Sequence, residues 1–331
     1  MRCLAACGTL AAGFALAGCG EQSALEPRSD AARTIETLWW WMLAVACVVI
    51  GGAVVLLLIA WLRRSRPGFP LLGEREDVAT GVVVLFGIGI PGVALIALFV
   101  VANFSAIDKT EAPDPATTAM TIEVTGNQFW WDVRYPGTTA VTANEIHIPA
   151  RTRVNVIART NDVIHSFWVP QLNRKIDMIP GETTRVLLFA DEPGRYRGQC
   201  AELCGLAHSQ MAMYVYADPP GEFRAWLERM AAPRPAPSTG SARSGERVFL
   251  NEACADCHTI RGTRARGEVG PDLTHLASRS TLAALTIPND REHLGGWIRD
   301  PQDVKPGNRM PALDLSDRER ADLLAYLRSL E

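Results

Sequence analysis

The sequence lacks any marked imbalance of charge. Its 331 residues carry 33 lysines and arginines against 36 aspartates and glutamates. A protein that binds nucleic acid concentrates positive charge, so this balance argues against a nucleic-acid partner. The length of the chain allows two or three domains.

Charge is missing altogether from two apolar runs, Leu38–Leu62 and Val78–Phe104. Each exceeds the ~20 residues needed to cross the hydrocarbon core of a membrane. Tryptophans bracket the first run, as interfacial aromatics do: Trp39, Trp40, Trp41 and Trp61. Three arginines, Arg63, Arg64 and Arg66, follow it directly, and this positive charge places the loop between the runs in the cytoplasm. We therefore expect residues 35–108 to form a transmembrane hairpin, with everything after Phe104 on the outer side of the membrane.

The chain begins with Met1-Arg2 and an apolar run that ends Leu16-Ala-Gly-Cys19. This pattern predicts an export signal over residues 1–18. Leu-Ala-Gly-Cys also resembles the lipobox of bacterial lipoproteins, and that resemblance implies cleavage before Cys19 and lipidation of its thiol. The alternative is an ordinary signal whose cleavage site happens to contain a cysteine.

Twelve residues, Cys200-Ala-Glu-Leu-Cys204-Gly-Leu-Ala-His208-Ser-Gln-Met211, offer two thiolates, an imidazole and a thioether. Soft and borderline ligands of this kind hold copper. The Cys-x3-Cys turn brings two sulfurs close together, and a further histidine, His165, lies upstream in an apolar, strand-like run. The alternative is a disulfide between Cys200 and Cys204, which an exported protein permits. A disulfide, however, requires neither a histidine nor a methionine.

This motif, Cys-x-Glu-x-Cys-x3-His-x2-Met with an upstream His-Ser-Phe-Trp, resembles the binuclear copper (CuA) centre of cytochrome c oxidase subunit II. The resemblance covers about residues 35–230 and includes Lys175–Gly181 and Gly126–Trp131. It implies a copper pair bridged by Cys200 and Cys204. The other implied ligands are three side chains and one backbone carbonyl (His165, His208 and Met211; Glu202). In the family, the carboxylate at the Glu202 position also faces a magnesium ion at the junction with subunit I.

Alternating apolar and polar residues predict short β-strands after the linker Glu111–Ala119. Pro-Gly pairs mark the turns between them, and strands at this spacing indicate a sandwich or barrel. The resemblance narrows the expectation to a cupredoxin-like Greek-key barrel over residues 119–230. An amphipathic helix over Pro219–Met230 is expected to close this domain, and His147 is interpreted as structural.

The aromatic run Phe129-Trp130-Trp131 has two interpretations. Aromatic side chains usually serve packing. In the family, however, the first aromatic of this run is a surface tryptophan above the copper pair, where electrons arrive from cytochrome c. The resemblance therefore implies electron input at this run, although Phe129 departs from the family pattern.

A Pro-rich linker over residues 231–240 precedes Cys254-Ala-Asp-Cys257-His258. Cys-x-x-Cys-His is the attachment signature of a c-type haem, in which the thiols add to the porphyrin vinyl groups and the histidine becomes an axial iron ligand. The alternatives are a redox Cys-x-x-Cys or half of a zinc site. A zinc site would need another cysteine pair or a paired histidine, and no cysteine follows Cys257.

Met310 is the only methionine after the linker, so it is the expected sixth ligand of the haem iron. His275 and His293 are the competing candidates. Residues 241–331 resemble a class I cytochrome c domain, and that resemblance implies that the carbonyl of Pro271 accepts a hydrogen bond from the His258 ring. Ser316 and Glu319 form a capping-box pattern that predicts a final helix.

We thus expect a multidomain protein: a two-helix hairpin, an all-β cupredoxin-like domain and a small all-α cytochrome c domain. The implied function is electron input to a haem–copper cytochrome c oxidase, located in the inner membrane with both metal domains on the periplasmic side. The implied partners are subunits I and III and an external cytochrome c or other donor. The alternatives are the copper subunit of a nitric oxide reductase and a membrane-anchored copper chaperone.

Overall fold

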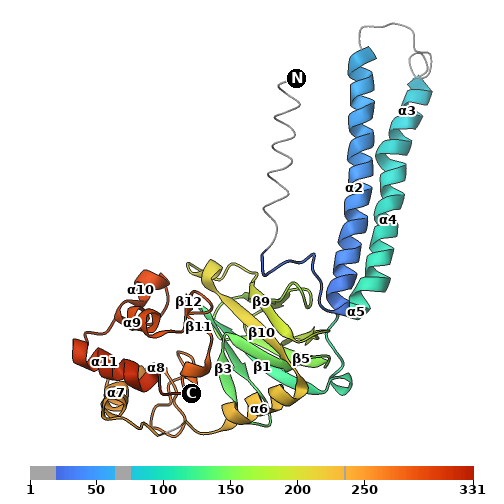
Figure 1. The fold of residues 1–331 in the computed structure, drawn as a ribbon. Helices are drawn as coiled ribbons and strands as arrows, with labels where there is room; N and C mark the ends of the chain where they lie inside the picture. Colours follow the sequence, from blue (N-terminus) through green and yellow to red (C-terminus); the bar gives the residue numbers. More distant parts are fainter. Residues whose placement is uncertain (1–19, 64–75, 235) are drawn as a thin grey trace, which may run out of the picture. The chain divides into compact units, whose positions relative to one another are not determined.

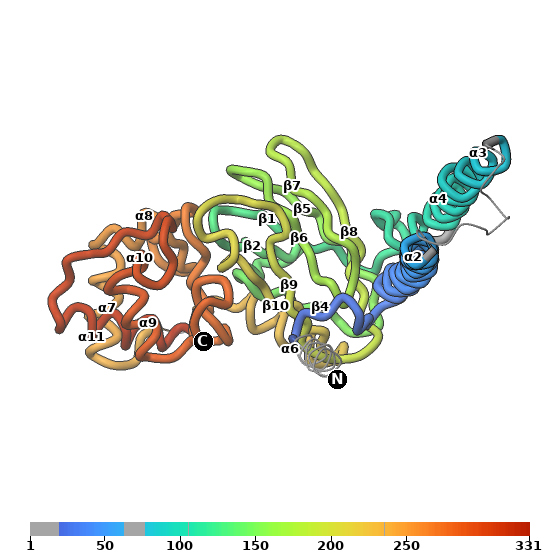
Figure 2. The backbone as a smooth tube through the Cα atoms, turned by 90° about the horizontal axis from the view of Figure 1, so that it is seen from above, coloured from blue at the N-terminus to red at the C-terminus, as the bar shows by residue number. Residues whose placement is uncertain are grey.

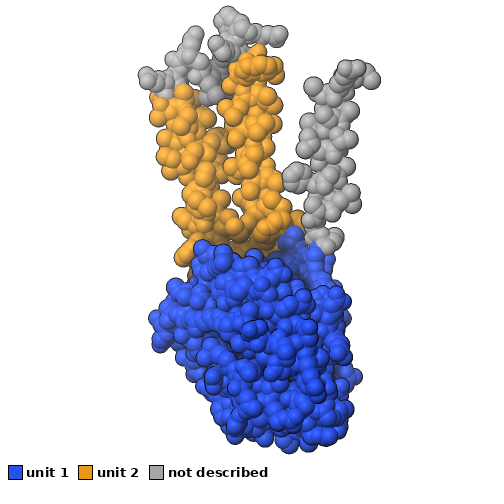
Figure 3. All heavy atoms as spheres, turned by 90° about the vertical axis from the view of Figure 1, so that its left-hand side faces the viewer, with its two compact units in different colours: residues 1–29, 112–331 blue, residues 30–111 orange. Residues whose placement is uncertain are grey.

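The computed structural model describes residues 20–63, 76–234 and 236–331. The expected signal peptide and Cys19 lie outside these residues. The chain divides into two compact units, Asp30–Glu111 and a second unit that combines Met1–Ser29 with Ala112–Glu331 (Figure 3).

The smaller unit consists of helices (Figure 1). Two stretches, Asp30–Leu62 and Asp77–Ala102, are long and apolar enough to cross a membrane, and their large apolar side chains are mostly exposed. Proline lacks an amide hydrogen and crowds the preceding turn, so the π-helical turn just before Pro91 is the expected local adjustment. The elements are α2 (Asp30–Arg63), α3 (Glu76–Val84), η1 (Leu85–Gly89), α4 (Ile90–Ala102), η2 (Asn103–Ile107) and α5 (Asp108–Thr110).

A β-sandwich follows the short 3-10 helix η3 (Pro115–Thr117), and its strands are traced in Figure 2. The first sheet has the order β3-β2-β1-β5-β8 and the second β4-β10-β9-β6-β7. The first comprises β1 (Met120–Asn127), β2 (Trp130–Arg134), β3 (Val141–Ala143), β5 (Val154–Thr160) and β8 (Thr184–Leu188). The second comprises β4 (Glu145–Pro149), β6 (His165–Trp168), β7 (Ile176–Met178), β9 (Gly194–Cys200) and β10 (Ala212–Asp218).

Each sheet contains one parallel pair, β1 with β5 and β4 with β10, among antiparallel neighbours. Parallel neighbours require crossover connections, which is consistent with the expected cupredoxin-like fold. The inward faces of both sheets bury large side chains in one core, among them Trp131, Phe167 and Met213. The expectation of an all-β, cupredoxin-like domain is confirmed.

Helix α6 (Pro220–Ala231) packs on this sandwich through Phe223 and Met230. His147 stacks on the rings of Tyr216 and Trp226, and its Nδ1 lies 2.7 Å from Asp218 Oδ2. These contacts confirm that His147 has a structural role.

The C-terminal domain is helical and has a hydrophobic core of its own. A Cβ atom on Gly245 would lie 2.0 Å from the carbonyl oxygen of Asp322, so glycine is required where α7 crosses α11. The predicted capping box of Ser316 and Glu319 begins α11. The domain also contains a two-stranded hairpin that the sequence did not predict. Its elements are α7 (Gly240–Asn251), α8 (Cys254–Cys257), η5 (Leu276–Ser278), β11 (Thr281–Leu282), β12 (Ile287–Pro288), α9 (Arg291–Arg299), α10 (Pro301–Val304) and α11 (Asp317–Leu327).

Candidate metal centres

The predicted copper ligands come from separate elements of the second sheet and its loops. His165 begins β6, Cys200 ends β9, and these two strands pair in antiparallel fashion. Cys204 lies in the loop after β9, His208 begins the 3-10 helix η4 (His208–Gln210), and Met211 immediately precedes β10. Strand pairing therefore brings a histidine that is 35 positions away in sequence beside the cysteine loop.

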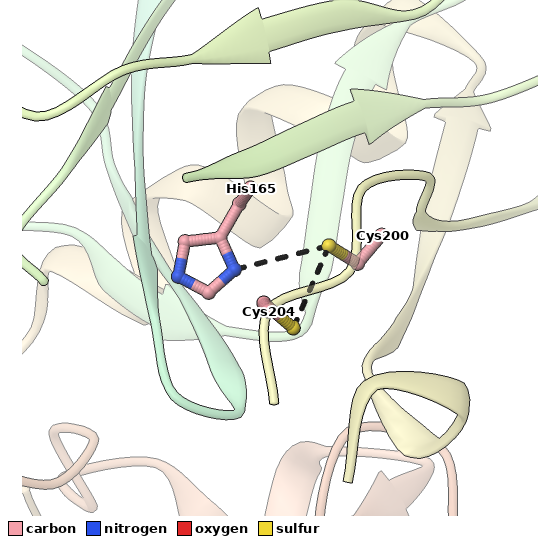
Figure 4. A group of neighbouring side chains, drawn as sticks. All are labelled: His165, Cys200 and Cys204. Atoms are coloured by element: carbon pink, nitrogen blue, oxygen red, sulfur yellow. Dashed lines mark hydrogen bonds between the residues drawn. The ribbon is translucent and has the colours of Figure 1, made fainter. Parts of the chain in front are cut away.

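Three side chains and one carbonyl converge around the two cysteine sulfurs. His165 points toward Cys200, and its Nδ1 lies 3.8 Å from Cys200 Sγ (Figure 4). Cys204 Sγ lies 3.6 Å from His208 Nδ1 and 3.8 Å from Met211 Sδ. The carbonyl oxygen of Glu202 lies 3.2 Å from Cys200 Sγ. The structure thus brings together every residue that the sequence proposed for copper.

The two cysteines are not bonded to each other. Their sulfurs lie 3.9 Å apart, well beyond the ~2.05 Å of a disulfide. The hydrogen bond between the two thiols is the largest cause of a lowered pKa of Cys200 and a raised pKa of Cys204. The pair therefore carries negative charge in a buried position, where a soft cation is the natural partner.

Asp162 fixes the orientation of His165, because its Oδ1 lies 2.8 Å from His165 Nε2 and leaves Nδ1 directed at the sulfur. Burial acts to lower the pKa of His165, but its contacts with Asp162 and Cys200 outweigh burial and raise it. The opposite side of the ring packs on Gly126, where a Cβ atom would lie 2.8 Å from His165 Cδ2. Carboxylate–histidine pairing of this kind is typical of metal sites.

The Glu202 carboxylate is half exposed, and its nearest described charged partner is Lys175, at 3.9 Å. Lys175 also lies 3.7 Å from Asp177. Magnesium binding by Glu202 therefore stays a prediction.

The predicted haem ligands line one cavity in the C-terminal domain. Cys254, Cys257, His258 and Met310 all contribute to its walls, which are otherwise mainly apolar. Both cysteines are free, as covalent attachment requires. Among the described residues that line this cavity, neither His275 nor His293 appears. His275 is engaged elsewhere, with ring nitrogens 2.7 Å from Glu331 O and 3.0 Å from Ala232 O.

His258 is oriented by its backbone surroundings. Its Nδ1–H donates to the carbonyl oxygen of Pro271 over 2.8 Å, as the cytochrome c resemblance implied. Burial lowers the pKa of His258, which favours the neutral imidazole that binds iron. A Cβ atom on Gly270 would lie only 2.4 Å from His258 Cε1, so this glycine makes room for the ring. The fit to an axially ligated c-type haem is therefore good.

The aromatic run separates the two candidate centres. Phe129 is buried and lines the haem cavity together with Trp130. The Phe129 ring also packs on Gly205, next to Cys204, where a Cβ atom would lie 3.0 Å from Phe129 Cζ. Trp131 instead lies inside the sandwich core, 6.0 Å from the His165 ring between centroids.

Sequence reasoning missed three residues that act at these centres. Asp162 could have been found, because it lies only three positions before His165 in the sequence. Gln128 donates from Nε2 to the carbonyl oxygen of Cys204 over 2.6 Å, and it lies just before the aromatic run. Lys305 is almost completely buried between the two domains, and no sequence signal marks it, since lysine usually lies at the surface.

Comparison with known proteins identifies both domains. Residues 138–217 match the family described as cytochrome c oxidase subunit II, periplasmic domain, and residues 242–331 match cytochrome c. The chain is 38% identical to cytochrome c oxidase subunit 2 of Alkalihalophilus pseudofirmus over 81% of this chain and 78% of that protein. It is 30% identical to the Bacillus subtilis subunit 2 over 82% of this chain and 81% of that protein.

Among solved structures, the periplasmic domain of cytochrome oxidase subunit II from Bradyrhizobium japonicum is 29% identical to this chain. That likeness covers 36% of this chain and 96% of that domain, with a TM-score of 0.34. The two relatives above extend over most of the chain and of their own lengths. On that evidence, this chain belongs to the cytochrome c oxidase subunit II family and carries a C-terminal cytochrome c domain.

Proposed function

We propose that this chain is the electron-input subunit of a haem–copper oxidase and that both metal centres lie within it. One observation carries the proposal: the sulfurs of Cys200 and Cys204, unbonded at 3.9 Å, lie among imidazole, thioether and carbonyl donors at 3.2–3.8 Å. When bound, a bridged copper pair would exchange one electron with little structural change.

The copper ligands we propose are the two cysteines, His165, His208, Met211 and the carbonyl of Glu202. The protein's own contribution is to hold these donors in place and keep water away. His165, Cys200, Cys204 and Met211 are buried. Asp162 and Gly126 leave the His165 ring one orientation, and Gln128 restrains the backbone at Cys204.

In the C-terminal domain, we propose that Cys254 and Cys257 attach the haem and that His258 and Met310 are its axial ligands. When bound, this haem would supply a one-electron carrier next to the copper domain. Pro271 holds the His258 ring through the 2.8 Å hydrogen bond and increases its basicity.

We propose that Phe129 and Trp130 form the contact through which the haem domain supplies electrons. Their position supports this role, since both line the haem cavity and Phe129 also packs beside Cys204. Trp131, which packs near His165, would act by holding that ring. A donor built into the same chain would explain why the family's surface tryptophan is replaced by a buried phenylalanine.

The remaining proposals concern the membrane, the partner subunits and the processing of the N-terminus. Helices α2 and α3–α4 would form a two-pass hairpin in the inner membrane and dock on subunits I and III, with subunit I reducing oxygen to water. Residues 1–18 would be removed, Cys19 lipidated, and Glu202 would face magnesium at the subunit I junction. An external cytochrome c or other donor would reduce the haem domain. The domain limits 35–108, 119–230, 231–240 and 241–331 belong to the same proposal.

Metal analysis of the purified oxidase tests the proposal directly. We expect two coppers and one covalent haem per copy of this chain, with a multi-line paramagnetic resonance spectrum from one electron shared by two coppers. Replacing Cys200 with serine should abolish that spectrum and leave the covalent haem in place. A single colourless cuprous ion would instead indicate a copper chaperone, and a disulfide between residues 200 and 204 would refute the copper site.

A further inference from the structure

The C-terminal domain contacts the copper loop on both sides of Met211. Lys305 donates from Nζ to the carbonyl oxygen of Gln210 over 2.9 Å, one residue before Met211. Gln210 Nε2 in turn donates to Val304 O over 3.0 Å. One residue after Met211, the amide of Ala212 donates to Ala284 O over 3.4 Å. The thioether donor therefore lies between two peptide groups that the cytochrome domain holds.

Lys305 makes the strongest of these contacts. Besides Gln210 O, its Nζ donates to Phe129 O over 2.7 Å and to Ala283 O over 2.9 Å. Three carbonyl acceptors match the three N–H donors of an ammonium group, whereas a neutral amine has only two. Only 2% of the residue is exposed, so these hydrogen bonds are shielded from water. Burial lowers the pKa of Lys305 to about 7, and the charge of Cys204 acts in the opposite direction.

The hairpin that presents Ala283 and Ala284 is strained. Ala283, Ala284 and Leu285 have φ values of 51°, 57° and 68°, a left-handed run without glycine. Such residues are energetically unfavourable and persist only where surrounding contacts enforce them. Here the enforcing contacts are Lys305 Nζ on Ala283 O and the Ala212 amide on Ala284 O.

We propose that Lys305 is a positioning residue of the copper centre: it clamps the cytochrome domain onto residues 210–212 and so sets the position of Met211. This inference rests on the proposed copper site. It adds that the haem domain does more than deliver electrons, because its docking determines how the thioether approaches the metal. Lys305 also holds the Phe129 carbonyl, so the same ammonium fixes the aromatic contact between the centres.

The test uses the complete purified oxidase with Lys305→Met, which keeps the length and apolar stem of the side chain but removes all three donors. Arg261→Met is the matched control. Arg261 also joins the two domains through backbone carbonyls, donating to Thr139 O over 2.6 Å and to Met230 O over 2.5 Å, but it does not contact the copper loop.

The first measurement is amide hydrogen exchange in copper-depleted protein, which requires no metal. We expect Lys305→Met to accelerate exchange of the Ala212 amide about tenfold or more, since charged hydrogen bonds of this kind are strong. In copper-loaded enzyme, we expect an altered paramagnetic resonance spectrum and a shifted copper midpoint potential, with the covalent haem still attached. Arg261→Met should leave the exchange of Ala212 and the copper spectrum as in the parent protein.

The outcomes separate this inference from the proposed function. A parent enzyme without copper would refute the proposed function. A copper-loaded parent with unchanged exchange and spectrum in Lys305→Met would refute the clamp alone. If Lys305→Met loses its haem spectrum, Gln210→Ala takes its place: it removes the Gln210–Val304 contact from the copper domain. If Gln210→Ala accelerates exchange of the Ala212 amide and alters the copper spectrum, even by less than expected for Lys305→Met, the clamp is supported. If Gln210→Ala exchanges and absorbs as the parent protein does, the clamp is overturned.

Discussion

At the copper centre, the ligands come from β6, from the end of β9 and from the loop before β10, and they are brought together by strand pairing. At the haem centre, Cys254, Cys257 and His258 lie within five consecutive residues, and only Met310 is distant in sequence. The copper ligands are packed into the sandwich, with Met211 and His165 fully buried in its interior. The proposed haem ligands instead line a cavity whose other walls include core residues of their own domain together with Phe129 and Trp130 of the copper domain.

This difference indicates how each domain depends on its metal. The sandwich has a continuous hydrophobic core that includes Cys200, Cys204 and Met211, so we expect its fold to depend little on the ion. The cytochrome domain shares several core side chains with the cavity wall, including Phe249, Leu294 and Leu323. A bound haem would therefore complete the hydrophobic core of the smaller domain, whereas copper would bind to a domain whose core is already continuous.

The largest effect should come from preventing haem attachment in the cytochrome domain and, for comparison, copper binding in the sandwich. Replacing Cys254 and Cys257 with alanine should abolish cooperative unfolding of residues 241–331, because a domain of about 90 residues has only ~5–9 kcal/mol of stability. Replacing Cys200 and Cys204 with serine should remove copper and leave the sandwich folded. Limited proteolysis with mass spectrometry shows which of the two domains has unfolded in each variant. A protease-resistant haem-free domain would contradict the comparison.

Next in size should be the effect of filling the space beneath each histidine ring. A Cβ atom on Gly270 would lie 2.4 Å from His258, and one on Gly126 would lie 2.8 Å from His165. We expect Gly270→Ala to destabilise its domain by roughly 1–3 kcal/mol, as overpacking does, and Gly126→Ala to perturb the copper spectrum with less loss of stability. Thermal unfolding and absorption spectra measure both. Gly221→Ala, where nothing lies within 4 Å, is the control.

A smaller effect should follow from weakening the contact that orients His165 while every proposed copper ligand is kept. Asp162→Asn keeps the size of the side chain but removes the charge that faces His165 Nε2 at 2.8 Å. Loss of such an orienting carboxylate should weaken copper affinity by about 10–100-fold. Competition with a copper chelator measures this. An unchanged affinity would mean that Gly126 and the core alone hold the ring.

The sequence identified candidate ligands that the structure brings together, because most of each motif is local and chemically distinctive; their role in binding metal stays a prediction. Cys-x3-Cys-x3-His-x2-Met and Cys-x-x-Cys-His carry their chemistry in a few residues, and the structure brings those residues together. The capping box at Ser316 and the Pro271 carbonyl on His258 were also predicted correctly, since both depend on short-range spacing.

The contacts between the two domains were not predictable in the same way. Lys305 follows no periodic pattern and resembles an ordinary surface lysine until tertiary packing buries it against three carbonyls. The hairpin β11–β12 was missed because Ala283 and Ala284 adopt left-handed conformations that sequence rules assign to glycine or asparagine. Such features arise from long-range packing, which local composition does not encode.

The smallest effect should come from Arg309, which connects the neighbourhoods of the two proposed metal centres by charge alone. It precedes Met310, and its Nη2 lies 3.7 Å from Asp162 Oδ2, on the carboxylate that orients His165. Its side chain is 59% exposed, so the ion pair should contribute only ~0.2–1 kcal/mol and weaken as salt is added. We expect Arg309→Gln to change the haem-to-copper electron-transfer rate less than threefold at low ionic strength and not at all at high ionic strength. Flash photolysis at two salt concentrations measures this. A large, salt-independent loss would mean that Arg309, and not the buried Lys305, holds the domains together.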